Sequence, residues 1–548
     1  MSNERQETLL ERIGQRASYR AAVPIAIVFV VLLLNISYLA TPAWVWDETY
    51  YYTLSSGVAR WAAAPTLDPD RIREVFREGN AHPPLPLYVM AITSSLFESP
   101  PDEVGAPPVD FLLAVRLATC LQFAALALVV FYFVKKEAGA LAAVFATVLT
   151  VLSPRLFAHS LMATYDVPMA LFWLATTVAF YHGMHSKRWA VACALAFGLA
   201  LLTKVNALLL PLALWPWGLY YHRSRALRAI GWMAALGPLV FFALWPWLWT
   251  APLRHFAEYI VDKFPAGAVP AFILSWTGTE AVAWREPART LYFGSVRAAG
   301  APWHYPFVMT LLTMPLAVMA GCAACAIAKK REHGPGRELV VLLGWSVLVQ
   351  LAVFAFVMTP FDGVRLFLAV LPLVSIAAGL GLLRLWECGG AKAAAAVALI
   401  VLSPGAEFFV YQPYGMSYFT PVIGGLPGAE RLGMEVTYYG EAIDPAGFAS
   451  INQRARAGER VAYAPMFADL PVLLPFYYTR YGILDGRLAP AAPWQDWDYL
   501  MWINRGGAIG PDEREFLTRG RVIHENRLLG VTLSKVLRSH SHFAGDDR

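Results

Sequence analysis

The chain has 548 residues, of which 57% are hydrophobic and 15% are charged, and its mean hydropathy is +0.48. Because soluble domains carry about 25% charged residues, these values exclude a large soluble enzyme and predict a polytopic α-helical membrane protein. The formal net charge is only +5, and no basic stripe with interleaved aromatic residues indicates a nucleic-acid partner.

Apolar runs of about the length that a membrane span needs, roughly 20 residues, occur about eleven times along the chain. We predict spans at 21–40, 111–134, 139–158, 166–182, 189–204, 206–221, 228–249, 304–328, 338–358, 364–384 and 392–411. The continuous stretch 189–221 fits either two passes or one broken, tilted helix.

The basic residues predict the orientation of these spans. Arg residues precede the first span, and pairs such as Lys135-Lys136 and Lys187-Arg188 fall in every second connection. Because cytoplasmic loops are enriched in Lys and Arg, we predict a cytoplasmic N-terminus (1–20) and a transmembrane module (21–411). The first run is too long for a typical signal-peptide core and has no convincing cleavage site. We therefore predict an uncleaved anchor in an integral membrane protein of the bacterial inner membrane.

Two of the predicted outer loops are long, 41–110 and 250–303. In the first, Asp68-Pro69 is typical of the N-cap and first position of a helix, and this favours capping over a metal-binding D-x-D. The apolar patch 83–97 is too short to span and is expected to lie in the membrane interface. The second loop contains Arg254, His255, Glu258, Asp262, Lys263, Glu280, Arg285 and Glu286.

Two adjacent carboxylates, Asp47 and Glu48, follow the first span inside an aromatic cluster, 44–52. A carboxylate at a membrane surface is costly to desolvate and is a functional candidate. One of the pair could act as a general base on a hydroxyl nucleophile while the other braces it. The alternative is that Asp47 simply caps the helix that follows.

Other ionisable residues lie at predicted outer ends of spans. His82 precedes Pro83-Pro84, whose rings fix the backbone, and it could bind a metal, a phosphate or a sugar or be structural. Arg116 and Asp166 are site candidates or a plain ion pair. Lys204 and Arg365 suit an anionic phosphate held partly in lipid. Their alternative role is snorkelling to lipid headgroups.

The five cysteines are Cys120, Cys193, Cys322, Cys325 and Cys388. All fall in apolar runs or beside a basic loop, so no disulfide framework is expected. The C-x-x-C at 322–325 lies in an apolar helix, and we interpret it as helix packing rather than redox or metal chemistry.

From about residue 412 the composition changes, because charge rises and the apolar runs shorten. Runs at 461–464, 499–503 and 530–537 have strand length, and stretches at 444–457 and 511–518 favour helices. We predict a small C-terminal α/β domain (412–548) outside the membrane. The chain has no P-loop, G-x-S-x-G or H-E-x-x-H motif, which argues against a nucleotide-driven pump.

The order of these motifs resembles a known group of enzymes. Along the chain come Asp47-Glu48 with aromatic residues, His82-Pro83-Pro84-Leu85, Arg116-Leu117, Ser153-Pro154-Arg155, Asp166, Thr203-Lys204 and Arg365. The pattern resembles the membrane glycosyltransferases of the C superfamily (GT-C), specifically family 39, the protein O-mannosyltransferase and aminoarabinose transferase group. The segment 421–440, which contains Tyr438-Tyr439-Gly440, also looks like the connection to the outer domain in bacterial members.

The resemblance implies a GT-C fold and an inverting transfer of a sugar from a polyprenyl phosphate to a hydroxyl of a protein, lipid or glycan. It implies that Asp47 is the catalytic carboxylate, with Glu48 beside it. Residues implied for donor phosphate or substrate binding are Arg116, Lys204, Arg365, His82 and Asp166. No cofactor is required. A divalent metal remains open, with His82, His255 and Glu258 as candidate ligands, although no spacing requires one.

Two other function classes remain as alternatives. A lipid-linked sugar flippase or other secondary transporter would also need many spans and intramembrane charges, but transporters often show paired, similar halves, and none is apparent here. A non-catalytic assembly protein would depend on the outer domain alone.

Overall fold

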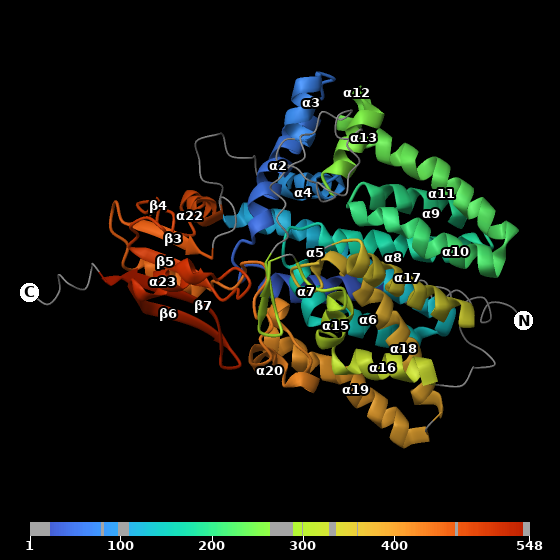
Figure 1. The fold of residues 1–548 in the computed structure, drawn as a ribbon. Helices are drawn as coiled ribbons and strands as arrows, with labels where there is room; N and C mark the ends of the chain where they lie inside the picture. Colours follow the sequence, from blue (N-terminus) through green and yellow to red (C-terminus); the bar gives the residue numbers. More distant parts are fainter. Residues whose placement is uncertain are drawn as a thin grey trace, which may run out of the picture.

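The computed structural model describes residues 22–77, 82–96, 109–263, 289–298, 300–327, 336–358, 360–388, 390–465 and 470–540. The predicted cytoplasmic segment 1–20 and the loop residues Glu280, Arg285 and Glu286 lie outside these ranges. The described part consists of a helical bundle with a small sheet at one end (Figure 1).

Each run predicted as a span contains a helix or a helix pair. In chain order these are Ala22–Tyr38, α5 (Val109–Ala138), α6 (Ala140–Val151) with α7 (Pro154–Ser160), α8 (Asp166–Gly183), α9 (Lys187–Leu201), η1 (Val205–Leu209) with α10 (Leu210–His222), α11 (Ser224–Ala243), α15 (Tyr305–Leu312) with α16 (Leu316–Ile327), α17 (Arg337–Phe356), η3 (Arg365–Phe367) with α18 (Val370–Cys388), and α19 (Gly390–Tyr411). Within the described residues, five helices are long and apolar enough to cross a membrane, or up to seven if each of two bent pairs is one span.

The predicted spans at 139–158 and 304–328 each form a bent pair of helices. Helices α6 and α7 meet at 67°, and α15 and α16 meet at 111°. Pro154 is the first residue of α7, and Pro315 directly precedes α16. Proline lacks the backbone N–H of a continuing helix and disfavours helical geometry in the residue before it, so both helices break there.

The stretch 189–221 forms two helices rather than one. His185 lies just before α9 and His222 ends α10, yet their ring centroids are 5.5 Å apart. The two helices therefore run in opposite directions. Lys204 lies at the turn between them with an extended backbone, φ −156° and ψ 152°.

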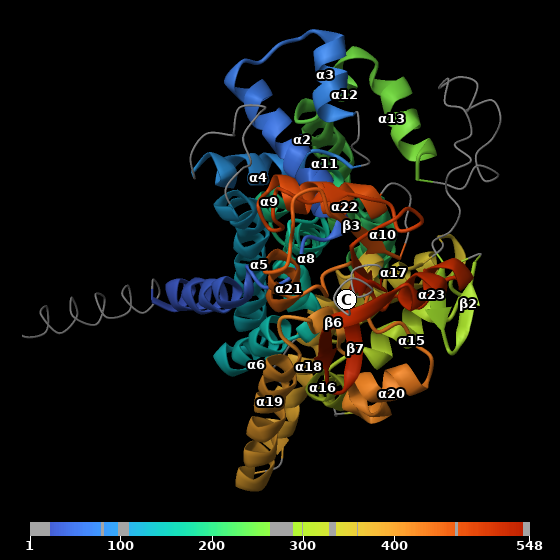
Figure 2. The ribbon, with the colours of Figure 1, turned by 90° about the vertical axis from the view of Figure 1, so that its left-hand side faces the viewer.

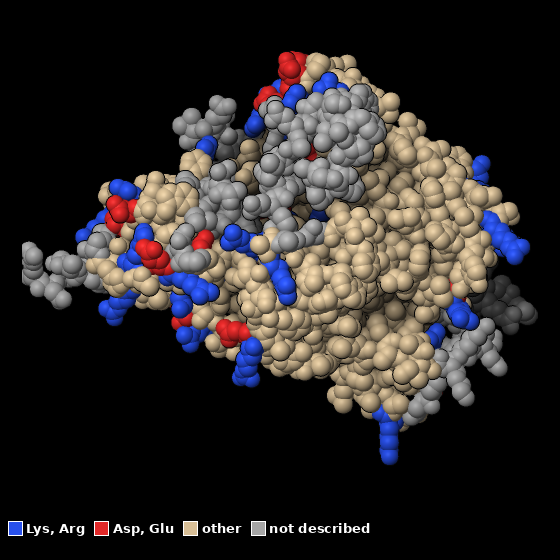
Figure 3. Space-filling model, viewed as in Figure 1, with Lys and Arg blue, Asp and Glu red and all other residues tan. Residues whose placement is uncertain are grey.

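Helices Ala22–Tyr38 and α19 are among those that present apolar side chains to the surroundings, and Figure 2 shows both projecting from the bundle. On Ala22–Tyr38, Ile25, Phe29 and Leu33 follow a four-residue spacing and are 66%, 64% and 53% exposed. On α19, Leu399 and Leu402 are also exposed. Contiguous apolar surface of this kind is rare on soluble monomers and fits contact with lipid. In Figure 3 the helical body is largely uncharged, and many of the charges gather over the sheet.

The first long loop contains the helices α2 (Trp46–Ala63), α3 (Pro69–Phe76) and α4 (Leu85–Ser95), and the second begins at the end of α12 (Trp247–Thr250) and contains α13 (Pro252–Val261). The predicted cap is confirmed, because the Asp68 carboxylate accepts the Asp70 N–H at 3.0 Å with Pro69 at the start of α3. An ion pair between Arg77 and Asp262 joins the two loops.

The C-terminal part is built on a five-stranded sheet in the order β4-β3-β5-β7-β6. Its elements are η4 (Gly415–Ser417), η5 (Pro421–Ile423), α20 (Gly425–Arg431), α21 (Pro445–Asn452), β3 (Arg460–Ala464), α22 (Leu470–Arg480), β4 (Ala489–Pro490), β5 (Tyr499–Ile503), α23 (Pro511–Thr518), β6 (Gly520–Leu528) and β7 (Val531–Ser539). Strand β3 pairs parallel with β4 and β5, whereas β7 pairs antiparallel with β5 and β6. The three strands and two helices predicted here from the sequence are confirmed.

Strand β5 is buried along its whole length and lies in the middle of the sheet. Next to the sheet, the hairpin of β1 (Thr290–Tyr292) and β2 (Ser295–Arg297) contacts the chain at Gly433, whose carbonyl accepts the Gly294 N–H at 2.9 Å. Helix α22 packs against α2, where Trp44 stacks on Tyr481 with centroids 4.9 Å apart. The C-terminal sheet domain therefore lies against the helical part near the start of α2.

The described cysteine side chains are free thiols: Cys120, Cys193, Cys322 and Cys325. Cys322 lies on α16 with its Sγ 3.4 Å from the Val374 carbonyl of α18. The C-x-x-C thus serves helix packing, as predicted. The side chain of Cys388 lies outside the described residues.

Candidate active site

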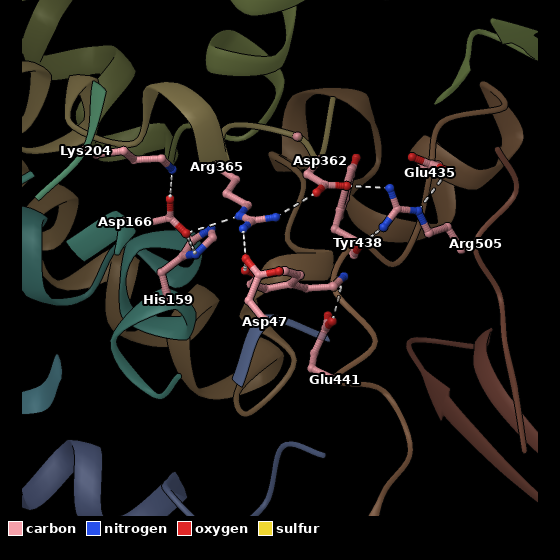
Figure 4. A network of polar contacts seen from close by, with 12 residues as sticks. Asp47, His159, Asp166, Lys204, Asp362, Arg365, Glu435, Tyr438, Glu441 and Arg505 are labelled. Atoms are coloured by element: carbon pink, nitrogen blue, oxygen red, sulfur yellow. Dashed lines mark hydrogen bonds and ion pairs between the residues drawn. The ribbon is translucent and has the colours of Figure 1, made fainter. Parts of the chain in front are cut away.

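Four predicted residues come together where helices begin or end. Asp47 lies in the first turn of α2, Asp166 begins α8, Lys204 follows α9, and Arg365 begins η3. Figure 4 shows their side chains converging. Carboxylates in the first turn of a helix are favoured by the positive end of the helix dipole, which explains why Asp47 and Asp166 are tolerated there.

Arg365 is the centre of the cluster and contacts three carboxylates. Its Nε lies 3.2 Å from Asp166 Oδ2, its Nη1 donates to Asp362 Oδ2 at 3.0 Å, and its Nη2 donates to Asp47 Oδ2. Lys204 Nζ donates to the other oxygen of Asp166 at 2.7 Å. Buried charges are stable only when paired in this way. The predicted cations and acids are thus one network.

Within this network Asp47 is the residue most open to a ligand. Its side chain is 29% exposed, against 11% for Arg365 and 1% for Asp166. Besides Arg365, the hydroxyl of Tyr439 donates to Asp47 Oδ2, and the hydroxyl of Tyr51 lies 3.3 Å from the same oxygen. A partly exposed, oriented carboxylate can accept a proton from an approaching hydroxyl.

Glu48 has a different environment, because it is fully buried and paired with Arg116. All five N–H donors of Arg116 are engaged, two by Glu48 and three by the backbone carbonyls of residues 39, 42 and 43. None remains to donate to a phosphate. The ion pair between Arg116 and Asp166 considered from the sequence is wrong, since Asp166 pairs with Lys204 and Arg365 instead.

The capping role considered for Asp47 is also wrong. Helix α2 has Val45 as its N-cap, and Glu48 Oε2 accepts the Val45 N–H at 3.0 Å. Glu48 also accepts the Ala163 N–H at 2.8 Å. The neighbour of Asp47 therefore performs the capping, which leaves Asp47 available to the cluster.

His82 lies close to the cluster, but its ring packs against aromatic side chains. Its ring centroid is 4.9 Å from that of Tyr165, which in turn packs against Tyr51 at 4.6 Å. Burial lowers the pKa of His82 well below its ordinary value, and the nearby charges of Lys263 and Lys204 lower it further. The imidazole is therefore neutral at pH 7.

The three metal-ligand candidates are not brought together. His255 stacks on Trp247 with centroids 4.5 Å apart, and Glu258 pairs with Arg254 at 3.1 Å. Among the described residues no group of three or more His, Cys, Asp or Glu side chains could hold a metal ion. The structure therefore gives no support to a metal site at these residues.

Sequence reasoning did not identify several members of the network: Asp362, Glu435, Tyr438, Tyr439 and Arg505 (Figure 4 labels all but Tyr439). Asp362 stands three residues before Arg365, and the tyrosines belong to the Tyr-Tyr-Gly segment, so both had a signal in the sequence. Arg505 and Glu435 had none, because their contacts depend on how the C-terminal sheet docks.

Known proteins support the family resemblance. Residues 81–249 match the family described as dolichyl-phosphate-mannose-protein mannosyltransferase. A comparison with curated protein sequences gave no match.

Several solved structures are similar to this chain. ArnT from Cupriavidus metallidurans, bound to undecaprenyl phosphate, is 17% identical and has a TM-score of 0.48, with 95% of this chain and 98% of ArnT covered. The archaeal oligosaccharyltransferase AglB from Archaeoglobus fulgidus is 10% identical with a TM-score of 0.46, covering 94% and 74%. The S. cerevisiae Pmt1-Pmt2 protein O-mannosyltransferase is 14% identical with a TM-score of 0.33, covering 50% and 38%. Over residues 81–249 the chain thus matches the dolichyl-phosphate-mannose-protein mannosyltransferase family, and the resemblance to membrane glycosyltransferases inferred from the sequence is confirmed.

Proposed function

We propose that this chain is an inverting glycosyltransferase that moves a sugar from a polyprenyl-phosphate donor to a hydroxyl acceptor at the outer face of a bacterial inner membrane. The observation that carries the proposal is the partly exposed Asp47 carboxylate, joined through Arg365 to Asp166 and Lys204. The family match over 81–249, described by its dolichyl-phosphate-mannose donor, supports the donor class.

In this mechanism Asp47 takes the proton from the acceptor hydroxyl as its oxygen attacks the anomeric carbon. The bond between that carbon and the phosphate oxygen breaks on the opposite face, and its electron pair leaves with the polyprenyl phosphate. Attack from one face and departure from the other inverts the anomeric configuration. The proton remains on Asp47 until product leaves.

The two cations match the charge that develops on the donor. A sugar linked through a phosphodiester has one negative charge, and the released polyprenyl phosphate has up to two. Lys204 and Arg365 therefore interact more strongly as the leaving group departs, which is the condition for accelerating the reaction. A donor phosphate competes for these cations with the carboxylates that hold them in the structure, Asp47, Asp166 and Asp362.

The remaining predicted site residues support this centre. The buried pair of Glu48 and Arg116 fixes the chain at the start of α2 and so places Asp47. His82 with Tyr165 forms an apolar wall beside Tyr51. We assign these side chains to shaping the site rather than to proton transfer or phosphate binding.

The two ends of α8 support the proposed sidedness of the site. Asp166 begins this helix, and His182 in its last turn lies 3.2 Å from Lys136, which belongs to a predicted cytoplasmic connection. The cluster and the basic connections therefore lie at opposite ends of the bundle. By the positive-inside rule, this supports an outward-facing site with the C-terminal sheet beside it.

The test is transfer by the full-length protein in liposomes. We expect labelled sugar to move from undecaprenyl-phosphate or dolichyl-phosphate sugars to a hydroxyl acceptor, with the anomeric configuration inverted, and no transfer from nucleotide sugars. Movement of the lipid-linked sugar across the bilayer without product would contradict the proposal and favour the transporter alternative.

A further inference from the structure

The loop that follows β5 is fixed between two other parts of the chain. Asn504 donates its backbone N–H to Leu533 O at 2.9 Å and its side-chain amide to Thr532 O at 2.8 Å. Three residues on, Gly507 donates its N–H to Glu435 Oε1 at 2.8 Å. A side chain at Gly507 would meet that carboxylate and the Arg289 carbonyl, each at 2.7 Å. The loop therefore has little freedom to move.

Arg505 leaves this loop toward the catalytic cluster. Its side chain is only 1% exposed, and it donates to Asp362 Oδ1 through Nη2 and to the Tyr438 carbonyl through Nη1. The Nε lies 3.8 Å from Glu435 Oε1. Figure 4 shows the guanidinium between these groups. A buried arginine with such a fork of donors holds its partner in one orientation.

Asp362 is the link between this arginine and the site. One of its oxygens accepts from Arg505, and the other accepts from Arg365 Nη1 at 3.0 Å. Its backbone φ is +56°, which is uncommon for a residue other than glycine. The next residue, Gly363, donates its N–H to the Tyr305 hydroxyl at 3.0 Å. The turn is therefore held on both sides, and the shared carboxylate connects the two guanidinium groups.

We propose that Arg505 is a positioning residue of the transferase: by holding one oxygen of Asp362, it sets the direction from which Arg365 meets Asp47. The inference rests on the proposed function and extends the active site into the C-terminal sheet. Without Arg505, both oxygens of Asp362 become available to Arg365. The guanidinium then turns toward Asp362 and away from Asp47, so the base and the phosphate-binding cation are no longer arranged together.

The experiment compares R505Q, R505K and R538Q with the wild-type protein in the liposome assay. Arg538 is the matched control, because it lies on β7 of the same sheet, where its guanidinium pairs with Glu459 at 3.6 Å and lies over the ring of Tyr499. We expect R505Q to lower kcat roughly 10- to 100-fold, the loss typical when a residue that orients a functional side chain is removed. The KM for the acceptor should stay unchanged. R505K, which keeps the charge, should fall between R505Q and wild type.

A structure of R505Q, or of R505K if R505Q does not fold, tests the positioning role without depending on measured transfer activity. We expect the Arg365 guanidinium to leave Asp47 and to pair with both oxygens of Asp362. If Arg365 stays on Asp47, or if R505Q transfers sugar as fast as R538Q, the positioning role is overturned. A wild-type protein that is inactive with every polyprenyl-phosphate sugar would refute the proposed function, and the structure of the variant would still decide the role of Arg505.

Discussion

Tyr439 and Arg365 meet at one atom: the hydroxyl of the first and the guanidinium of the second both donate to Oδ2 of Asp47. The guanidinium carbon also lies 3.9 Å from the centre of the Tyr439 ring. Tyr439 is 392 residues from Asp47 in the chain. The carboxylate proposed as the base is thus held between the membrane part and the C-terminal segment.

Removing the Tyr439 hydroxyl should slow transfer without unfolding the protein. A hydrogen bond to a charged group contributes about 1.5–3 kcal/mol, so Y439F should lower kcat/KM roughly 10- to 100-fold. The measurement is steady-state transfer, with the melting temperature as a check on folding. Y88F is the matched control, since that hydroxyl donates to the Leu244 carbonyl at 2.7 Å. Equal activity of Y439F and Y88F would contradict the role of Tyr439.

Disrupting the Glu48–Arg116 pair should mainly lower the stability of the folded protein rather than act directly on the transfer reaction. R116M leaves a fully buried carboxylate without its partner, which typically costs about 3–5 kcal/mol. We expect R116M to lose folded protein and melting temperature, and the double variant E48M/R116M to recover much of the loss. Thermal unfolding of the purified variants measures both. A double variant as unstable as R116M would show that Arg116 acts mainly through its backbone contacts.

Glu435 should make the stability of the protein depend on pH. Burial raises the pKa of this carboxyl to about 7 from its ordinary 4.5, although the Arg505 charge and the Gly507 N–H lower it and the Asp362 charge raises it. The folded state thus binds the proton more tightly than the unfolded chain. Its stabilising contribution is fully present below pH 4.5 and is lost as the pH rises through about 7. The difference between these two pKa values corresponds to about 3 kcal/mol in the free energy of unfolding.

The check is the melting temperature of wild type and E435Q between pH 4.5 and 8. We expect the wild-type value to fall over this window more steeply than that of E435Q, whose neutral amide cannot ionise. Parallel curves for the two proteins would show that Glu435 does not titrate in this range.

Lys204 should act on the donor lipid. Its Nζ is 2.7 Å from Asp166 and belongs to the cationic side of the network. K204Q should weaken binding of undecaprenyl phosphate roughly 10-fold or more, because charge-assisted hydrogen bonds to phosphate are lost. K187Q is the control, since Lys187 is exposed at the other end of α9. Radiolabelled-lipid binding that is equal in the two variants would remove Lys204 from the phosphate site.

The sequence predicted the parts of the fold that depend on local pattern. Apolar length located the helices, and Asp68-Pro69 located the start of α3. The sequence analysis did not predict the bends at Pro154 and before Pro315, because the length of an apolar run carries no information about the angle between two helices. The prolines themselves were visible in the sequence. The order of motifs was enough to bring Asp47, Asp166, Lys204 and Arg365 to one candidate site.

The partners of these residues could not be predicted in the same way. An ion pair of Arg116 with Asp166 was one alternative from the sequence, but Arg116 pairs with Glu48, whose carboxylate also accepts backbone N–H groups. Asp362 and Arg505 are 143 residues apart, and their contact exists only because the loop after β5 docks on the turn before η3. Pairings of this kind depend on tertiary packing, which no local pattern records.

The most direct test of the account is transfer by D47N beside D68N. Both changes replace aspartate by asparagine in the same loop, but Asp68 only caps α3, and asparagine caps a helix as well as aspartate. We predict that D68N transfers sugar from the polyprenyl-phosphate donor at the wild-type rate, whereas D47N falls by roughly 10²–10⁴-fold, the range for a lost general base, while keeping its melting temperature. A folded D47N that transfers as fast as D68N would contradict the claim that Asp47 is the catalytic carboxylate.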